Sequence, residues 1–280
     1  VAQRYTYRHQ DNQIEKIETG TLTSGTATSL QVFATSTTTY DSKGLATKTV
    51  DTSPTTTETV QQFTYDSRNR QICLATRMNP AKFSALPTSA CSVGTSGDYG
   101  ADRIVRHYYD TLSRVTKTVS GYGIDDAGID VEIDYTNNGQ VEWRKDGNGN
   151  QTDYDYDGVD RLYRTTFADG SYEQNTYDKN SNLKTWRKRD GKYFTHYYDD
   201  TNLKYRTNIT GESTLYYDYD GFGRQVKAWR GSDYVSFGYD GLGRLASSNT
   251  NGRTLGYQYD GASRRSRLTH PDGFYVTYAY

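Results

Sequence analysis

The sequence predicts an all-β protein made of tandem antiparallel β-hairpins that join into one long coiled sheet. Three observations support this fold class. A motif beginning with Tyr-Asp recurs about every 21 residues, and a second turn signal lies midway through each period. The composition is also rich in Tyr and Thr, which favour strands, with 28 Tyr in 280 residues but only four Pro and one Met.

The Tyr-Asp motif sets the period of the chain. From Tyr135 to Tyr280 the steps between successive motif tyrosines are 21, 21, 21, 21, 20, 20 and 21 residues. From Tyr40 to Tyr135 the steps are looser, at 25, 44 and 26 residues. A series this regular indicates that one structural unit is repeated along the chain.

We therefore treat residues 1–280 as a single repeat region. It is irregular over 1–134, where 73–108 form an insertion, and regular over 135–280. The chain opens with Val rather than Met, and we interpret it as a fragment of a longer chain.

Each period contains two turns and therefore two strands. The second turn is marked by Gly, mostly after Asp or Asn, and such dipeptides are typical of hairpins. These turns lie at Asp146-Gly147, Asp169-Gly170, Asp190-Gly191, Gly211, Gly231, Asn251-Gly252 and Asp272-Gly273. Two turns of about four residues leave about six residues for each strand, which is a common strand length.

The motif turn can be built from the copy at Tyr239. Asp240 and Arg244 are expected to face each other at the neck of the hairpin, with Tyr239 opposite Leu245 on the other face. The three-residue loop between them ends at Gly243, where such loops adopt a left-handed backbone. Gly, Asn and Asp suit this conformation, and Ser is expected to fit less well. Ser occupies the position at Ser113, Ser181 and Ser263.

The recurring motif residues are the structural site residues that the sequence predicts. Tyrosines two residues apart before each turn point to one face of a strand, so stacked hairpins should line them into aromatic ladders. The predicted structural residues are Tyr156, Asp157, Arg161, Leu162, Tyr177, Asp178, Tyr219, Asp220, Gly223, Arg224, Tyr239, Asp240, Gly243, Arg244, Tyr259 and Asp260.

The number of strands indicates the architecture. Seven periods give about 14 strands, and so wide a sheet should coil because each strand pair twists by roughly 20°. The chain has too few aliphatic residues to fill the inside, so we expect a curved sheet around a cavity. A β-propeller is the alternative, because two periods match one four-stranded blade. Only one hairpin type is evident, whereas a propeller alternates inner and outer strands.

The repeat resembles the Tyr-Asp (YD) repeats of the Rhs family, which includes bacterial polymorphic toxins, shell components of insecticidal toxin complexes and animal teneurins. The resemblance covers essentially the whole chain, is strongest over 135–280, and is most complete over 146–162. It implies a strand spiral that closes into a hollow shell around a C-terminal polypeptide, often a toxin, which is cleaved from it. Nothing here resembles the family's self-cleavage segment, so the resemblance implies no catalytic residue.

The resemblance implies a structural, non-enzymatic function as the repeat wall of a secreted or cell-surface bacterial protein. Its partner would be another segment of its own chain, the enclosed C-terminal polypeptide. The alternative is an extracellular adhesion or carbohydrate-binding surface, with cell-surface glycans stacking on Tyr or on Trp143, Trp186 and Trp229. A glycan hydrolase is disfavoured, because an active site needs one unusual carboxylate pair rather than the same Asp in each unit.

Charge and hydropathy argue against two other classes of partner. Lys and Arg number 33 against 34 Asp and Glu, a net charge of -1 with no extended basic patch, which disfavours a nucleic-acid binder. No stretch approaches the roughly 18 apolar residues of a membrane span, so we expect no membrane insertion.

Cys73 and Cys91 are the only cysteines, and both lie in the stretch that breaks the period. In an exported protein this even count favours a disulfide, worth about 3 kcal/mol by loop entropy, over two buried thiols. A metal site built on these cysteines would need further ligands, and the closest His is His107.

The segment Asp146-x-Asn148-x-Asn150 suggests a calcium loop. An EF-hand-like loop requires Gly at its sixth and Glu at its twelfth position, but these are Gln151 and Asp157. We therefore expect no metal, no cofactor and no catalytic residue.

Overall fold

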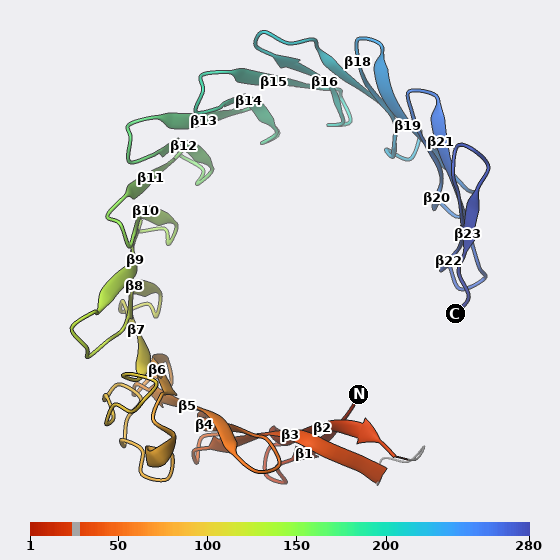
Figure 1. Cartoon of the computed structure of the whole chain (residues 1–280). Coiled ribbons are helices and arrows are strands. Elements are labelled where there is room, and N and C mark those ends of the chain that lie inside the picture. The colour runs from red at the N-terminus through yellow and green to blue at the C-terminus, as the bar shows by residue number, and fades with distance from the viewer. Residues whose placement is uncertain (24–28) are drawn as a thin grey trace. The chain divides into compact units, whose positions relative to one another are not determined.

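The computed structural model describes residues 1–23 and 29–280, and these residues form an all-β structure (Figure 1). Its 23 strands belong to one antiparallel sheet. The chain divides into two compact units, Val1–Thr152 and Asp153–Tyr280, which are described separately.

In the N-terminal unit, each strand pairs antiparallel with the next one along the chain. A short 3₁₀ helix, η2 (Pro80–Lys82), lies between β6 (Gln71–Arg77) and β7 (Arg103–Tyr109). The strands are β1 (Ala2–Tyr7), β2 (Ile14–Leu22), β3 (Leu30–Tyr40), β4 (Ala46–Thr52), β5 (Thr57–Tyr65), β6 (Gln71–Arg77), β7 (Arg103–Tyr109), β8 (Val115–Ser120), β9 (Gly128–Tyr135) and β10 (Val141–Asp146).

The C-terminal unit continues the same pattern of sequential antiparallel pairs. Its strands are β11 (Gln151–Tyr156), β12 (Leu162–Thr166), β13 (Tyr172–Tyr177), β14 (Leu183–Arg187), β15 (Tyr193–Tyr198), β16 (Lys204–Ile209), β17 (Leu215–Tyr219), β18 (Gln225–Arg230), β19 (Asp233–Tyr239), β20 (Leu245–Thr250), β21 (Arg253–Tyr259), β22 (Arg265–Thr269) and β23 (Tyr275–Thr277).

This pairing confirms the prediction of tandem antiparallel hairpins in one sheet. Within each unit the hydrogen-bonded ladder passes from one hairpin to the next, whereas separate propeller blades would interrupt it after every fourth strand. The propeller alternative is therefore wrong.

The motif turn has the neck expected from the sequence and an added irregularity. The Asp240 and Arg244 backbones are hydrogen-bonded at the neck, and Tyr239 lies opposite Leu245. The preceding pair is Gly238 with Ser247, so one extra residue bulges on the strand after the turn. The loop residue with a left-handed backbone can also be Ser, since φ is +69°, +66° and +62° at Ser113, Ser181 and Ser263.

The described residues contain little fully buried apolar material. Cys73, Ala75, Ala90 and Ile104 form one small cluster in the N-terminal unit, and most strand residues are only half-buried. The other buried hydrophobic residues are Val60, Val119 and Ile209. Neither unit is thus organised around a solid aliphatic interior.

Candidate functional site

The motif Asp closes its own turn. At Asp157, Oδ1 accepts hydrogen bonds from the backbone N–H groups of Val159 and Arg161, both at 3.0 Å. The same pair of bonds, from the second and fourth residues after the Asp, recurs at 2.8–3.0 Å in the other motif turns that contain Asp. Asp suits this position because its short side chain can replace a backbone acceptor in a tight turn.

The motif Arg connects its own turn to the next hairpin. Arg161 donates from Nε to Asp157 Oδ2 at 2.8 Å, and its guanidinium carbon lies 4.5 Å from the centre of the Tyr177 ring. In six described turns the Nε–Oδ2 distance is 2.6–2.8 Å and the distance to the next motif Tyr ring is 4.3–4.7 Å. These six turns contain Arg70, Arg114, Arg161, Arg224, Arg244 and Arg264.

The motif Tyr completes the link through its hydroxyl group. Tyr177 donates to the carbonyl oxygen of Leu162, the residue directly after the Arg of the preceding motif, at 2.8 Å. Tyr259 makes the same bond to Leu245 at 2.9 Å. The bond recurs at 2.7–3.1 Å from Tyr109, Tyr135, Tyr198, Tyr219, Tyr239 and Tyr280. At the six turns with Arg, ion pair, stacking and hydroxyl bond together join one hairpin to the next at the turn end, and we call this set the Tyr–Asp–Arg link.

The electrostatics of the link keep the motif carboxylates ionised. Hydrogen bonds from the Arg161 side chain and backbone lower the pKa of Asp157, and Arg224 has the same effect on the pKa of Asp220. At Asp240 the backbone N–H of Arg244 is the main cause of the lowered pKa. Proton transfer near neutral pH favours a carboxyl with a raised pKa, so these groups are suited to holding turns together.

Acid should weaken this network. Since the folded chain holds these carboxylates at a lowered pKa, their contribution to stability is fully present above the unfolded Asp pKa of about 3.9 and is lost as pH falls through the folded values. We expect denaturant midpoints measured between roughly pH 2 and pH 6 to decline below about pH 4. Asp157→Asn, which retains a turn-closing oxygen, should flatten that decline, and a profile with no acid limb would contradict this role.

The hydroxyl bond can be tested by deleting one oxygen atom. Tyr259→Phe should lower the free energy of unfolding by about 1 kcal/mol, because the Leu245 carbonyl loses its donor. Tyr193→Phe is the matched control, since the Tyr193 hydroxyl is exposed and has no hydrogen-bond partner among the described residues. Equal denaturant midpoints for the two variants would show that the link adds nothing to stability.

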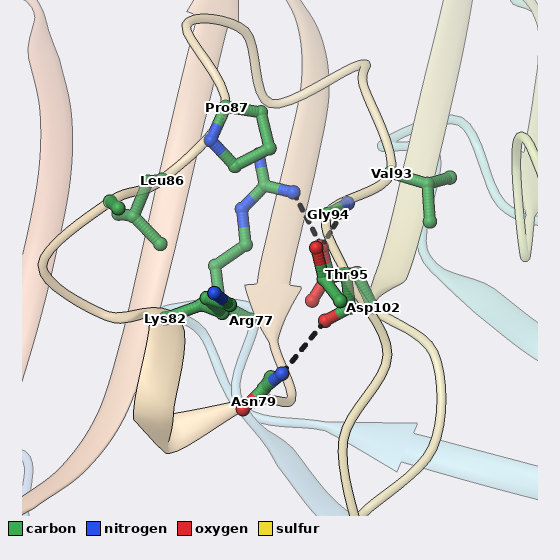
Figure 2. A pocket seen from close by; sticks show the side chains of 10 residues that line it. Arg77, Asn79, Lys82, Leu86, Pro87, Val93, Gly94, Thr95 and Asp102 are labelled. Carbon is green, nitrogen blue, oxygen red and sulfur yellow. Dashed lines mark hydrogen bonds and ion pairs between the residues drawn. The ribbon is translucent and has the colours of Figure 1, made fainter.

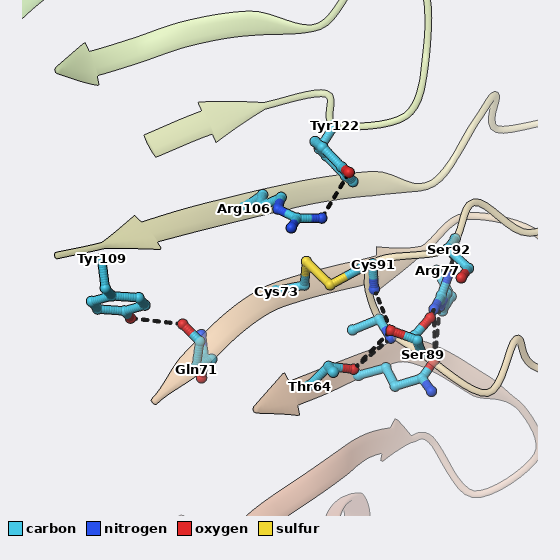
Figure 3. The surroundings of a disulfide bond; sticks show 12 residues. Thr64, Gln71, Cys73, Arg77, Ser89, Cys91, Ser92, Arg106, Tyr109 and Tyr122 are labelled. Atoms are coloured by element: carbon cyan, nitrogen blue, oxygen red, sulfur yellow. Dashed lines mark hydrogen bonds between the residues drawn. A yellow bond between two sulfur atoms is a disulfide. The ribbon is translucent and has the colours of Figure 1, made fainter. Parts of the chain in front are cut away.

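The segment that breaks the period lies between two paired strands. Strands β6 and β7 pair directly, and the intervening residues 78–102 pack against them. Cys73 on β6 and Cys91 in this segment form a disulfide with their Cα atoms 5.3 Å apart (Figure 3). The bond fastens the segment to the sheet at its most buried cluster.

A buried ion pair between Arg77 and Asp102 also attaches this segment to β6. The side chains of Arg77 and Asp102 are 2% and 4% exposed, and Nη1 lies 2.7 Å from Oδ2 (Figure 2). Arg77 also donates to the backbone oxygens of Ser89 and Ser92 and to Gln62 Oε1. Asp102 accepts from the backbone N–H groups of Met78 and Gly94.

These two side chains also line a cavity of about 280 Å³ in the segment. Their hydrogen-bonding groups are already engaged with the protein, as Figure 2 shows for the contact of Asp102 with Gly94. The ion pair therefore has a structural explanation that requires no ligand.

The other candidates from the sequence also have positions in the fold. Asp146 Oδ1 accepts from the backbones of Asn148 and Asn150, so the supposed calcium loop is a turn of the motif type. Among residues 1–23 and 29–280, no cluster of three or more His, Cys, Asp or Glu is placed to hold a metal ion. Over the same residues, no helix has the length and apolar character to cross a bilayer.

Comparison with known proteins identifies a family whose repeat includes two of the linked turns. Residues 235–275 match the family model of the RHS repeat. They include the Tyr239 and Tyr259 motifs, whose Tyr–Asp–Arg links recur through both units. The chain contains an RHS repeat. No curated protein matches it by sequence.

Solved structures share the fold of this Rhs-repeat chain. A crystal structure of TcdB2-TccC3-Cdc42 matches with a TM-score of 0.51 and 12% identity over 96% of the chain. A Tc holotoxin pore of Photorhabdus luminescens, with a substitution in TccC3, matches with a TM-score of 0.52 and 12% identity over 98%. TcdB2-TccC3 without its hypervariable C-terminal region gives 0.51, 13% and 96%. The Rhs-repeat chain spans 18% of the length of each of these chains.

Sequence reasoning placed the motif Asp and Arg in the turn but missed the contact between the Arg and the next motif Tyr. The signal was present, because a Tyr follows the Arg by 15 or 16 residues in the regular part of the chain, as from Arg161 to Tyr177 and from Arg244 to Tyr259. The Arg77–Asp102 pair left no such signal, since neither residue belongs to the motif.

Proposed function

We propose that this Rhs-repeat chain forms part of the wall of a secreted or cell-surface bacterial protein, and that the wall encloses another polypeptide segment of the same protein. The observation that carries the proposal is the Tyr–Asp–Arg link. At the six turns where it occurs, the link joins one hairpin to the next rather than to a central core, so a sheet of this kind can extend by adding hairpins.

The exposed surface supports a wall rather than a globule. The accessible surface is 17468 Å². Two separate compact domains of half this mass would together expose about 14,700 Å² by the usual scaling. The excess is expected of single-layer sheets, whose two faces are both available, one to solvent and one to contents.

The proposal gives the repeats a mechanical role without chemistry. A wall protects its contents by excluding proteases, and the many links between hairpins slow its opening, which is kinetic stability. The motif carboxylates take part in this role through their turns and ion pairs.

Limited proteolysis of the full-length gene product tests containment. We expect the enclosed segment to resist protease while the repeats are folded and to be cut rapidly once denaturant opens them. The excised segment, digested alone, is the control for its intrinsic sensitivity. Equal cleavage rates in the full-length protein and in the excised segment would contradict containment.

A carbohydrate-binding surface is the second candidate, and one contact favours it. Tyr216 on β17 and Trp229 on β18 stack with ring centres 5.2 Å apart and planes 17° apart, and Tyr216 is 37% exposed. Paired rings of this kind can stack on the apolar face of a sugar. Binding on a glycan array that is lost in Trp229→Ala would support this function, and an array without signal would oppose it.

A further inference from the structure

The motif turn at Asp199, in the C-terminal unit, lacks the Arg of the link. Leu203 follows Asp199 by four residues, which is the position occupied by Arg in the six linked turns. In those turns the guanidinium group has three kinds of partner. They are the Asp Oδ2 atom, the ring of the next motif Tyr and, at Arg70, the backbone oxygen of Asp110 in the next turn at 3.0 Å.

The partners of the missing guanidinium are still in place at Leu203. Asp199 Oδ1 accepts two backbone bonds at 2.9 Å and a bond from the Thr201 hydroxyl at 2.7 Å, but Oδ2 has no hydrogen-bond partner among the described residues. The Tyr219 hydroxyl donates to the Lys204 carbonyl at 2.9 Å, as in the other motifs. Within the described chain, no cation lies over the Tyr219 ring, whereas the Lys204 ammonium lies 5.0 Å from the centre of the Tyr217 ring. Burial, Tyr217 and the Asp199 charge raise the pKa of Tyr219.

Leu203 replaces the aliphatic part of the arginine side chain but not its guanidinium group. At a linked turn, Arg224 Nη1 lies 3.2 Å from the position that a Cβ would take at Gly243 in the next turn. At the unlinked turn, the Leu203 Cδ atoms lie 3.9 Å from the equivalent position at Gly223. The apolar side chain thus follows the same path and leaves the polar end of the site unfilled.

A groove opens at this point of the sheet. Strands β16 and β17 pair through Arg206 with Tyr216 and Thr207 with Leu215. The ends of these strands next to the motif turns lie outside these two pairs. The groove has a volume of about 560 Å³ and is lined by Asp199, Leu203, Tyr217, Asp218, Tyr219 and Asp220. It therefore combines carboxylates with aromatic rings, the surroundings that a guanidinium group has in the linked turns.

Among the other motif turns without Arg, one has an amide in the place of the guanidinium. Asn182 donates from Nδ2 to Asp178 Oδ2 at 3.0 Å, so an amide takes the place of the guanidinium. Where Leu45 follows Asp41, the Lys43 ammonium donates to Asn69 Oδ1 of the next turn at 3.0 Å. Among the described residues it makes no hydrogen bond to Asp41 and does not lie over the Tyr65 ring, so this turn also lacks the guanidinium contacts. The turn at Asp199 has no such amide, and it borders the groove.

We propose that this groove binds the side chain of an arginine from a polypeptide that lies along the turn edge of the sheet. The planar guanidinium would donate to Asp199 Oδ2 and to the Asp220 backbone oxygen and stack on the Tyr219 ring. An ammonium group suits the site less well, because it is strongly hydrated and lacks a flat face for stacking. The proposal holds whether or not the repeats enclose cargo.

Titration with N-acetylarginine methylamide, followed by the NMR signals of Asp199 and Tyr219, tests the site in the 280-residue chain. We expect saturable shifts with this probe and none with the citrulline analogue, which has the same shape but no charge. Added salt should weaken the shifts, because the site is open to solvent. Equal shifts with both probes, or none with either, would overturn the proposal.

Two variants identify the groove as the place of binding. Leu203→Arg should fill the groove with a guanidinium group of the chain itself, raise the thermal midpoint by about 2 °C and abolish the NMR shifts. Leu203→Met adds no charge and should retain the shifts. Asp199→Asn keeps the turn-closing oxygen, removes the charge and should weaken binding about five-fold. Undiminished binding in Leu203→Arg, or in Asp199→Asn if the first variant does not fold, would refute the assignment.

Discussion

Replacing Arg77 with Met should lower the free energy of unfolding of the N-terminal unit by about 3–5 kcal/mol. The guanidinium is buried against Asp102, and its removal leaves that carboxylate 4% exposed with no opposite charge beside it. The Ser89 and Ser92 carbonyls lose their donor in the same step, so residues 78–102 lose most of their polar attachment to β6. Denaturant unfolding followed by circular dichroism measures the loss.

The motif provides a matched control for this prediction. Arg161→Met removes an arginine that is also paired with an aspartate, but the Arg161 and Asp157 side chains are 29% and 24% exposed. Water can then solvate the remaining carboxylate, and the cost should be about 1 kcal/mol or less. Similar losses for the two variants would show that burial of the Arg77 pair does not set its contribution.

The contrast between these two ion pairs also shows how much of the site the sequence could predict. Asp157 and Arg161 are four residues apart in a turn that the chain repeats, so their pairing follows from hairpin geometry and a regular period. Arg77 and Asp102 are 25 residues apart, and the chain between them has no period. Local rules cannot predict such a contact, which depends on how one particular segment packs.

Two features of the motif hairpins lay between these extremes. The bulge lies on the strand after the motif turn, opposite the step from Gly238 to Tyr239, and no particular residue type marks it in the sequence, so it was not predicted. The left-handed Ser residues were expected to fit less well, yet Ser113 Oγ lies 3.3 Å from Arg70 Nη1 of the preceding motif, and Ser263 Oγ lies 3.2 Å from Arg244 Nη1. A contact between neighbouring repeats accompanies the local backbone cost there, and only the structure shows it.

Removing the disulfide is the second change with a large expected effect. The double variant Cys73→Ala/Cys91→Ala should lower the free energy of unfolding of the N-terminal unit by about 3 kcal/mol, the loop-entropy value for the sequence separation of 18 residues. Alanine is the suitable replacement because Cys73 is fully buried beside Ala75 and Ala90, where a serine hydroxyl would need a partner. Denaturant midpoints of the wild type and the double variant give the difference.

Reductant provides the control, and a triple variant tests whether the two attachments act on one segment. Added dithiothreitol should lower the midpoint of the wild type toward that of the alanine variant and leave the variant unchanged. Because the disulfide and the Arg77–Asp102 pair both fasten residues 78–102, losing one should free part of what the other restrains. Adding Arg77→Met to the alanine variant should therefore cost less than Arg77→Met alone, by more than about 0.5 kcal/mol. Strictly additive losses would mean that the two attachments stabilise the sheet independently.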